Sequence, residues 1–225
     1  FRVNTLITVK NKDRIITIAI DLFNDYGTKV ITTNHIAKEI GISPGNLYYH
    51  FKNKFDIIRS ISDKFNTEIE SVFQIQINTI FDFSNNIISM YNCFFRIQQS
   101  YQFLFTEGIY LTSQDHILLD NYQKLRTTIK KDYHKLLKNL ITINIIKKET
   151  FNIIDDLLNT QWIIMWYWVS HSLLDRTTYN NLQIQKGIKL SFSIIAPHLT
   201  SIGKVEFEKT MNTLNLRNEK TKFHI

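Results

Sequence analysis

The chain has 225 residues, of which 44% are hydrophobic, and a formal net charge of +7 at pH 7, so it can bury a sizeable core as one large helical domain or as a small domain joined to a larger one. Its single cysteine, Cys93, excludes an intrachain disulfide, and its longest aromatic and apolar run, residues 162–169, is far shorter than the ~20 residues of a membrane span. Since no charged-then-apolar leader opens the chain, we expect a cytoplasmic protein without a membrane partner.

The first predicted element is a helix whose apolar residues run from Ile15 to Tyr26. Apolar residues recur through it at every third or fourth position, which is the spacing of one helix face. Gly27 follows directly, where the glycine that caps the carboxyl end of a helix belongs. These features together predict one helix.

Two short helices follow, and the turn between them is only a few residues long. Thr32 and Thr33 are good cap residues for a helix over residues 34–40, and Gly41 ends that helix. Ser43, a favoured N-cap residue, then starts the next helix. Two helices joined by a short turn that contains glycine are the sequence signature of a helix-turn-helix.

The third helix combines a well-defined start with an unusually polar and aromatic surface. Pro44 suits its first position, because the missing N–H would have no partner there in any case. Gly45 costs roughly 1 kcal/mol relative to alanine, and close approach of the backbone to a partner is the simplest compensation. Leu47 and Phe51 are four residues apart and can anchor the helix to a core. The residues left to point outward, as a nucleic-acid reader needs, are Asn46, Tyr48, Tyr49 and His50.

The rest of the chain predicts a larger helical domain, so that the fold class is all-α. Asn53 can cap a fourth helix that begins at Lys54. We place the small domain at residues 1–54 and the large one at residues 55–225. The small domain carries eight Lys and Arg against four Asp and Glu, a net charge of +4, and the large domain carries nineteen against sixteen, a net charge of +3. The small domain therefore has the higher positive charge per residue, as expected of a surface that binds phosphate. Breaks between later helices are expected near residues 82–84, 106–113, 147–150, 176–180 and 200–203.

The motifs of the first domain follow one another in a specific order. They are Leu22-Phe23 with Gly27, Thr32-Thr33 with Ile36-Ala37, Gly41-Ile42-Ser43, Leu47-Tyr48-Tyr49-His50-Phe51 and Asn53-Lys54. In this order and spacing, residues 12–58 resemble the DNA-binding domain of the TetR/AcrR family of bacterial repressors. The resemblance covers about a fifth of the chain. It implies a three-helix DNA-binding domain, a larger helical domain for effector binding and dimerisation, and a transcriptional regulator, by the family's usual mode a repressor.

The resemblance also implies how these residues meet DNA. Thr33 would contact a phosphate at the positive end of the helix dipole, and Gly45 would let the third helix sit deep in the major groove. Asn46 suits a bidentate contact to adenine, or a phosphate contact instead. Tyr48 and Tyr49 would contact phosphates or thymine methyl groups, the alternative being that they pack on their own domain. His50 and Lys54 would contact phosphates, the alternative for Lys54 being a solvated side chain. The predicted DNA-binding residues are Thr33, Ser43, Gly45, Asn46, Tyr48, Tyr49, His50 and Lys54.

Two later helices suggest a homodimer. Residues 151–174 are apolar nearly all round in their second half, so this helix must be buried on two sides. In the next helix, Gly187 and Ser191 are four residues apart, and small residues there would let another helix approach closely. We expect both helices to pair with their symmetry mates across a two-fold axis, the alternative being that both fill the core of a monomer. The predicted interface residues are Trp168, Ile184, Gly187, Ile188, Ser191 and Ile195.

A small-molecule effector is a further implication of the resemblance. Its binding would change the separation of two DNA-reading heads and release the DNA, which requires tighter binding to the DNA-incompetent state. The aromatic residues of the large domain would suit a hydrophobic effector, although aromatic residues at helical spacing also form ordinary cores. The predicted ligand-binding residues are Tyr91, Phe94, Phe95, Tyr101, Phe103, Gln161, Trp162 and Trp166.

An enzyme is the competing class, and the motifs argue against it. The seven histidines are scattered, with no His-x-x-x-His pair and no Cys or Glu at metal-ligand spacing. The sequence also lacks a phosphate-binding glycine loop, a Gly-x-Ser-x-Gly turn and a Cys-His nucleophile pattern. We expect no catalytic residue, metal or cofactor. The expected partners are a roughly palindromic double-stranded DNA operator, a second copy of the chain and a small hydrophobic effector; a regulator without an effector and a helical protein-interaction module remain alternatives.

Overall fold

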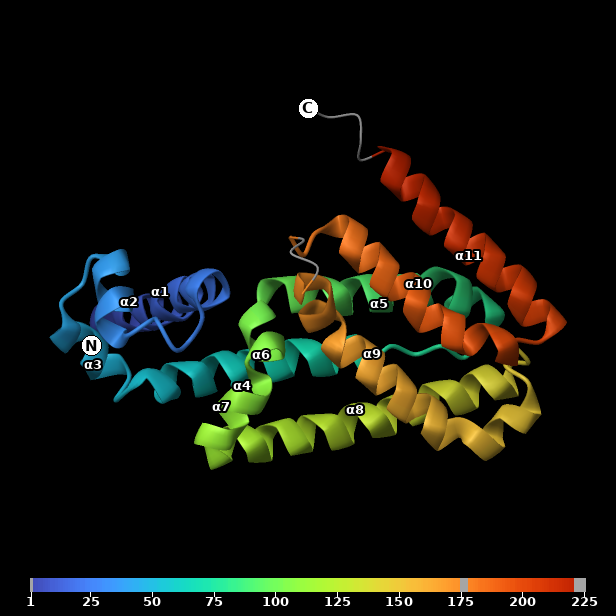
Figure 1. The fold of residues 1–225 in the computed structure, drawn as a ribbon, viewed down its shortest axis with the longest axis horizontal. Coiled ribbons are helices and arrows are strands. Elements are labelled where there is room, and N and C mark those ends of the chain that lie inside the picture. Colours follow the sequence, from blue (N-terminus) through green and yellow to red (C-terminus); the bar gives the residue numbers. More distant parts are fainter. Residues whose placement is uncertain (1, 175–177, 221–225) are drawn as a thin grey trace. The chain divides into compact units, whose positions relative to one another are not determined.

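The computed structural model describes residues 2–174 and 178–220, with side chains for residues 11–174 and 178–212. Every regular element in these ranges is helical, and the one β-type pairing is an isolated bridge between Ile146 and Leu199 (Figure 1). The prediction of an all-α fold with an N-terminal helix-turn-helix and a larger helical part is confirmed. Within the same ranges, no helix is long and apolar enough to cross a membrane.

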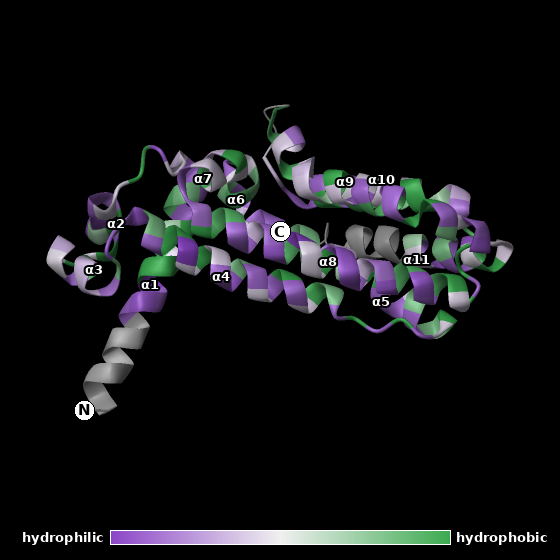
Figure 2. Cartoon of the chain, turned by 90° about the horizontal axis from the view of Figure 1, so that it is seen from below, coloured by the Kyte–Doolittle hydropathy of each residue, from purple (hydrophilic) through white to green (hydrophobic). Residues whose placement is uncertain are grey.

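Hydrophobic and hydrophilic residues are interleaved along the helices, so that a helix can bury one face and expose another (Figure 2). The elements are α1 (Arg2–Tyr26), α2 (Thr33–Ile40), α3 (Pro44–His50), α4 (Lys54–Phe73), α5 (Ile80–Ser100), α6 (Gln102–Thr106), α7 (Gly108–Gln114), α8 (His116–Thr142), η1 (Lys148–Ile153), α9 (Ile154–Leu174), α10 (Asn181–Ile195), η2 (Ala196–His198) and α11 (Ser201–Lys220).

Packing divides the chain into two compact units. The first unit runs to Glu68 and includes Ser100–Leu125; the second contains Ile69–Gln99 and the residues from Arg126 onward. Helices α4 and α8 contribute residues to both units. The units therefore describe packing, whereas the predicted division of function at residue 54 stays a prediction.

The core of the first unit anchors the helix-turn-helix. Ile36 of α2 and Leu47 of α3 are fully buried. Phe23 of α1 packs against Phe103 of α6, with the ring centroids 5.2 Å apart. The short α2 and α3 are too small to be stable alone, so the burial of Ile36 and Leu47 and the packing of α2 against α1 hold them in place.

The second unit buries five of the six residues that we predicted for a dimer interface, and Trp168, the sixth, is partly exposed. Helices α9 and α10 lie side by side (Figure 1). A Cβ added to Gly187 would lie 2.7 Å from both Phe95 and Trp168 of the same chain, so this glycine serves close packing within one protomer. The indole Nε1 of Trp168 donates to the carbonyl of Gln183 at 2.8 Å. The protomer itself buries Ile184, Gly187, Ile188, Ser191 and Ile195. The interface between two copies of the chain stays a prediction.

Some helix breaks lie elsewhere than predicted. The break expected at residues 82–84 falls inside α5, whose start is fixed by a capping box: Thr79 Oγ1 accepts from the Asp82 N–H at 3.1 Å, and the Asp82 carboxylate accepts from the Thr79 N–H at 2.9 Å. A carboxylate near a helix start marks the first turn and not an interruption. The break expected at residues 176–180 lies partly outside the described residues.

Candidate nucleic-acid interface

The start of α2 is fixed by a reciprocal cap. Thr32 Oγ1 accepts from the His35 N–H at 3.3 Å, and His35 Nδ1 accepts from the Thr32 N–H at 3.4 Å. Such a capping box satisfies backbone donors that the helix leaves unpaired. Thr33 is then the first residue of α2, at the positive end of the helix dipole, where a phosphate is stabilised.

The turn between α2 and α3 is set by Gly41. This residue has φ +76°, in the left-handed region that glycine adopts without strain. The N–H of Ile42 donates to the carbonyl of Ala37 at 3.0 Å and closes the end of α2. Ser43 then caps α3, because its Oγ accepts from the Asn46 N–H at 3.2 Å. Three residues thus separate the two helices.

Helix α3 has one anchored side and one free side. Leu47 is fully buried, and Phe51, which follows the helix, is almost fully buried. On the free side Asn46 is exposed and Tyr49 has 76% of its surface exposed. Gly45 is exposed as well, and a Cβ added there would meet only Ser43 Oγ, at 3.9 Å. Nothing within the described protein therefore requires a glycine at this position.

Two hydroxyl groups of the predicted DNA-binding set lie together. Thr33 Oγ1 and the Tyr48 hydroxyl are 3.1 Å apart and share a hydrogen bond. Tyr48 is half exposed, so the pair stays open to solvent. Next along α3, the rings of Tyr49 and His50 meet edge to face with centroids 5.2 Å apart. Because the Thr33 and Tyr48 hydroxyls have one proton each, their mutual bond leaves one O–H free to donate to a phosphate, and both hydroxyls can bind the same phosphate once the bond between them opens.

The ammonium group of Lys54 lies against the turn that precedes α2. Its Nζ donates to the carbonyl oxygens of Thr28 and, at 3.0 Å, Ile31. Burial lowers the pKa of Lys54, and the nearby Glu107 carboxylate opposes that shift. The same carboxylate accepts hydrogen bonds from the Thr28 N–H, at 3.0 Å, and from the Thr28 hydroxyl. Lys54 and Glu107 together hold this turn. Sequence reasoning missed Glu107, because nothing local links it to a turn 79 residues earlier.

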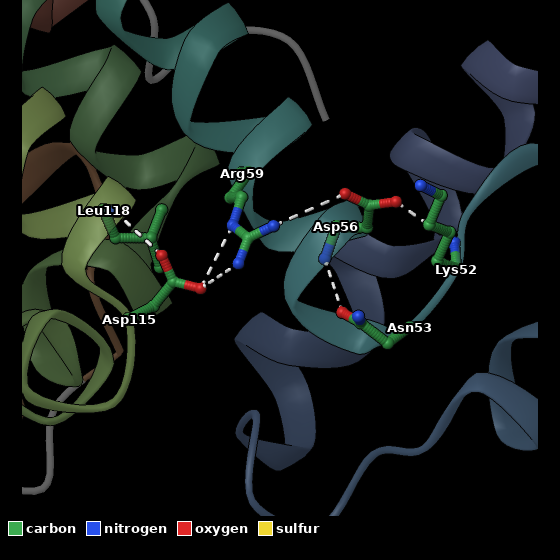
Figure 3. A network of polar contacts seen from close by, with 6 residues as sticks. All are labelled: Lys52, Asn53, Asp56, Arg59, Asp115 and Leu118. Carbon is green, nitrogen blue, oxygen red and sulfur yellow. Dashed lines mark hydrogen bonds and ion pairs between the residues drawn. The ribbon is translucent and has the colours of Figure 1, made fainter.

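A second polar network begins just after α3 (Figure 3). Asp56 accepts from the N–H of Lys52 at 3.1 Å and lies 3.6 Å from the guanidinium of Arg59. Arg59 donates to Asp115 through Nε at 3.0 Å and Nη2 at 2.5 Å, while Asp115 accepts from the Leu118 N–H at 3.0 Å. The bond to Arg59 is the main cause that lowers the pKa of Asp115. The sequence between α3 and α4 is thereby tied to the start of α8.

The predicted ligand-binding residues are divided between the two units. Tyr101 and Phe103 belong to the first unit: the Tyr101 hydroxyl donates to Glu68 at 2.9 Å, and Phe103 packs on α1. The other predicted residues belong to the second unit. Of these, four line one small cavity: Phe94, Gln161, Trp162 and Trp166.

The arrangement of α2, the Gly41 turn and an exposed α3 defines the chain as a helix-turn-helix DNA-binding protein. Two family models cover most of the sequence. The model of bacterial regulatory proteins of the tetR family matches residues 15–61, and the TetR model of bacterial transcriptional repressors matches residues 64–207. The chain belongs to the TetR family, whose members are DNA-binding transcriptional regulators and not enzymes.

Individual relatives agree with this assignment. An HTH-type transcriptional regulator of Staphylococcus aureus strain RF122 is 49% identical over 49 residues, which are 22% of this chain and 26% of the relative. Another from strain USA300 is 31% identical over 141 residues, or 52% of this chain and 74% of the relative. A TetR-family regulator of Marinobacter aquaeolei VT8 superposes with a TM-score of 0.75 at 27% identity, covering 88% of this chain and 98% of that one.

Proposed function

We propose that the chain is a transcriptional repressor that binds a roughly palindromic operator in the cytoplasm as a homodimer and is released by a small hydrophobic effector. The free side of α3 is the observation that supports DNA binding most strongly. It combines an exposed glycine whose added Cβ would meet only Ser43 Oγ, an exposed asparagine and an exposed tyrosine. A helix with this surface can lie with its backbone close to base edges.

Six of the predicted residues have side-chain roles in this proposal. Asn46 and Tyr49 contact bases, and the hydroxyls of Thr33 and Tyr48 share a phosphate. His50 contacts the backbone nearby. Lys54 stays a proposed phosphate contact, because the two backbone carbonyls that it binds occupy two of its three N–H donors and leave one for DNA.

The proposed homodimer uses the exposed sides of α9 and α10. On α9, Ile163 and Tyr167 are four residues apart on one face, with 58% and 43% of their surfaces exposed. On α10, Leu182 and Leu190 are exposed. Apolar helix faces of this kind favour self-association, and a two-fold dimer would place two α3 helices on half-sites about 34–36 Å apart or at a related spacing.

The DNA-binding proposal is tested with DNA from upstream of the chain's own gene. Fluorescence anisotropy should show that Asn46→Ala and Tyr49→Ala each weaken binding by about tenfold, equivalent to one bidentate or aromatic contact. Tyr26→Ala, at another exposed tyrosine of the first unit, is the matched control and should leave the affinity unchanged. Wild-type affinity in both α3 variants would refute the assigned reading helix.

Light scattering tests the assembly. Ile163→Asp should convert the dimer into a monomer, because a carboxylate cannot be buried unpaired at an apolar interface. Ile109→Asp, at an isoleucine of α7 that is even more exposed, should leave the dimer intact. A wild-type chain that is monomeric at micromolar concentration would exclude the dimer.

A further inference from the structure

Gln161 of α9 is a polar side chain in the apolar interior of the second unit. Only 1% of its surface is exposed. Its Nε2 donates to the Tyr91 hydroxyl at 3.2 Å, whereas its Oε1 has no hydrogen-bond partner among the described residues. A buried carbonyl oxygen without a partner destabilises the folded state. Such a group needs an explanation, and a ligand that donates a hydrogen bond to it is one.

The cavity beside Gln161 is lined mainly by apolar and aromatic side chains. Its wall includes Phe73, Phe94, Trp162 and Trp166. The two indole rings are stacked, with centroids 4.4 Å apart and an angle of 12° between their planes. The cavity measures about 20 Å³, which is room for about one water molecule. Flat ring faces of this kind match a flat aromatic ligand, for which the wall would have to move.

Tyr133 offers a way for the wall to move. It lines this cavity and also a second one of about 20 Å³ that Tyr91 and Phe192 line as well. A movement of the Tyr133 ring would therefore join the two cavities. The hydroxyls of Tyr91 and Tyr133 hydrogen-bond each other. Burial raises the pKa of Tyr91, and that of Tyr133 to about 12, so both phenols stay neutral at physiological pH and present no charge to a ligand.

We propose that this site binds a flat aromatic molecule with one hydroxyl or ring N–H group, and that this group donates a hydrogen bond to Gln161 Oε1. The proposal rests on the proposed effector function. The aromatic body fills apolar space, and the donor supplies the bond that Oε1 lacks. A pure hydrocarbon would leave Oε1 unpaired, and a carboxylate at this position would face it with a second acceptor.

Two probes of nearly equal shape test this chemistry. 1-Naphthol carries a hydroxyl where 1-methylnaphthalene carries a methyl group, and their binding to the full chain is measured by calorimetry. We expect 1-naphthol to bind about tenfold more tightly. In Gln161→Leu and Gln161→Met the preference should disappear. Two variants are used so that a folding defect in one, seen by circular dichroism, leaves the test intact. Gln185→Leu, at a half-buried glutamine of α10, should keep the preference.

Three results would overturn the inference: equal affinity for the two probes, no binding of either, or a preference that survives in both Gln161 variants. Release from operator DNA is measured separately. If 1-naphthol binds through Gln161 but operator affinity stays constant, the inferred site stands and the proposed effector function fails. If some other compound releases the DNA while the Gln161-dependent preference is absent, the effector function stands and the inferred site fails.

Discussion

Replacing Gly45 by alanine should separate the stability of α3 from its function. The Cβ would meet only Ser43 Oγ, at 3.9 Å, which is ordinary van der Waals contact. Alanine is favoured over glycine within a helix by up to ~1 kcal/mol. Because Gly45 lies in the first turn of a seven-residue helix, we expect a gain of a few tenths of a kcal/mol to ~1 kcal/mol. Urea unfolding should therefore show equal or higher stability.

The same methyl group should weaken operator binding. It projects from an exposed position beside Asn46, on the side of α3 that we propose to face the DNA. If the backbone must approach the DNA closely there, the methyl group forces α3 outward and lengthens several contacts. We expect a loss of at least ~1.4 kcal/mol, or tenfold in affinity, measured by anisotropy. Gly108→Ala, at another helix start with open space, is the control and should keep full affinity. Full affinity in Gly45→Ala would refute the argument for close approach.

Three further outcomes are expected. Asp115→Ala should lower the unfolding free energy by ~2 kcal/mol, since it removes both the cap of α8 and a partly exposed ion pair. Asp115→Asn can still cap the helix and should lower it by ~1 kcal/mol. Equal losses in both variants would contradict this. The pKa of Asp115 is lowered in the folded chain, so its contribution to the unfolding free energy is present above about pH 4 and is lost as the pH falls further. The difference in unfolding free energy between wild type and Asp115→Asn should therefore shrink at acid pH. Thr33→Val and Tyr48→Phe should each lower operator affinity by about fivefold. The double variant should lose less than the product of the two single losses, because the two hydroxyls are hydrogen-bonded to each other. Fully additive free-energy losses would show that the two hydroxyls act separately.

The helix-turn-helix could be predicted because its determinants are local. Ser43 and Gly41 fix the ends of helices through hydrogen bonds to residues no more than five positions away, and such motifs are legible in the sequence. The burial of Leu47 and the exposure of Tyr49 follow from helical spacing. Sequence patterns of this kind place each side chain on one face of a helix. In α3 that was enough to predict which side chains are buried and which are exposed.

In the second unit, helical spacing alone did not predict which helices pack together, because several helices there have apolar residues on more than one side. At Gly187 the close neighbours, Phe95 and Trp168, belong to the same chain, whereas the spacing of the small residues predicted a second copy there. Helical spacing also placed Gln161 among aromatic residues without showing which of its two amide atoms finds a partner. Both facts depend on residues distant in sequence, which no local pattern encodes.

The turn at Thr28 shows that a DNA-reading head also depends on residues beyond its own surface. Its carbonyl accepts from Lys54, while its N–H and hydroxyl donate to Glu107. Thr28 is almost fully buried, so this turn, only a few residues before α2, cannot exchange these bonds for water without opening the unit. The position of Thr33, which we propose to contact a DNA phosphate, is therefore set partly by a carboxylate between α6 and α7. A change at Glu107 should lower operator affinity although its carboxylate is used inside the protein, and for that reason loss of binding alone does not identify a DNA contact.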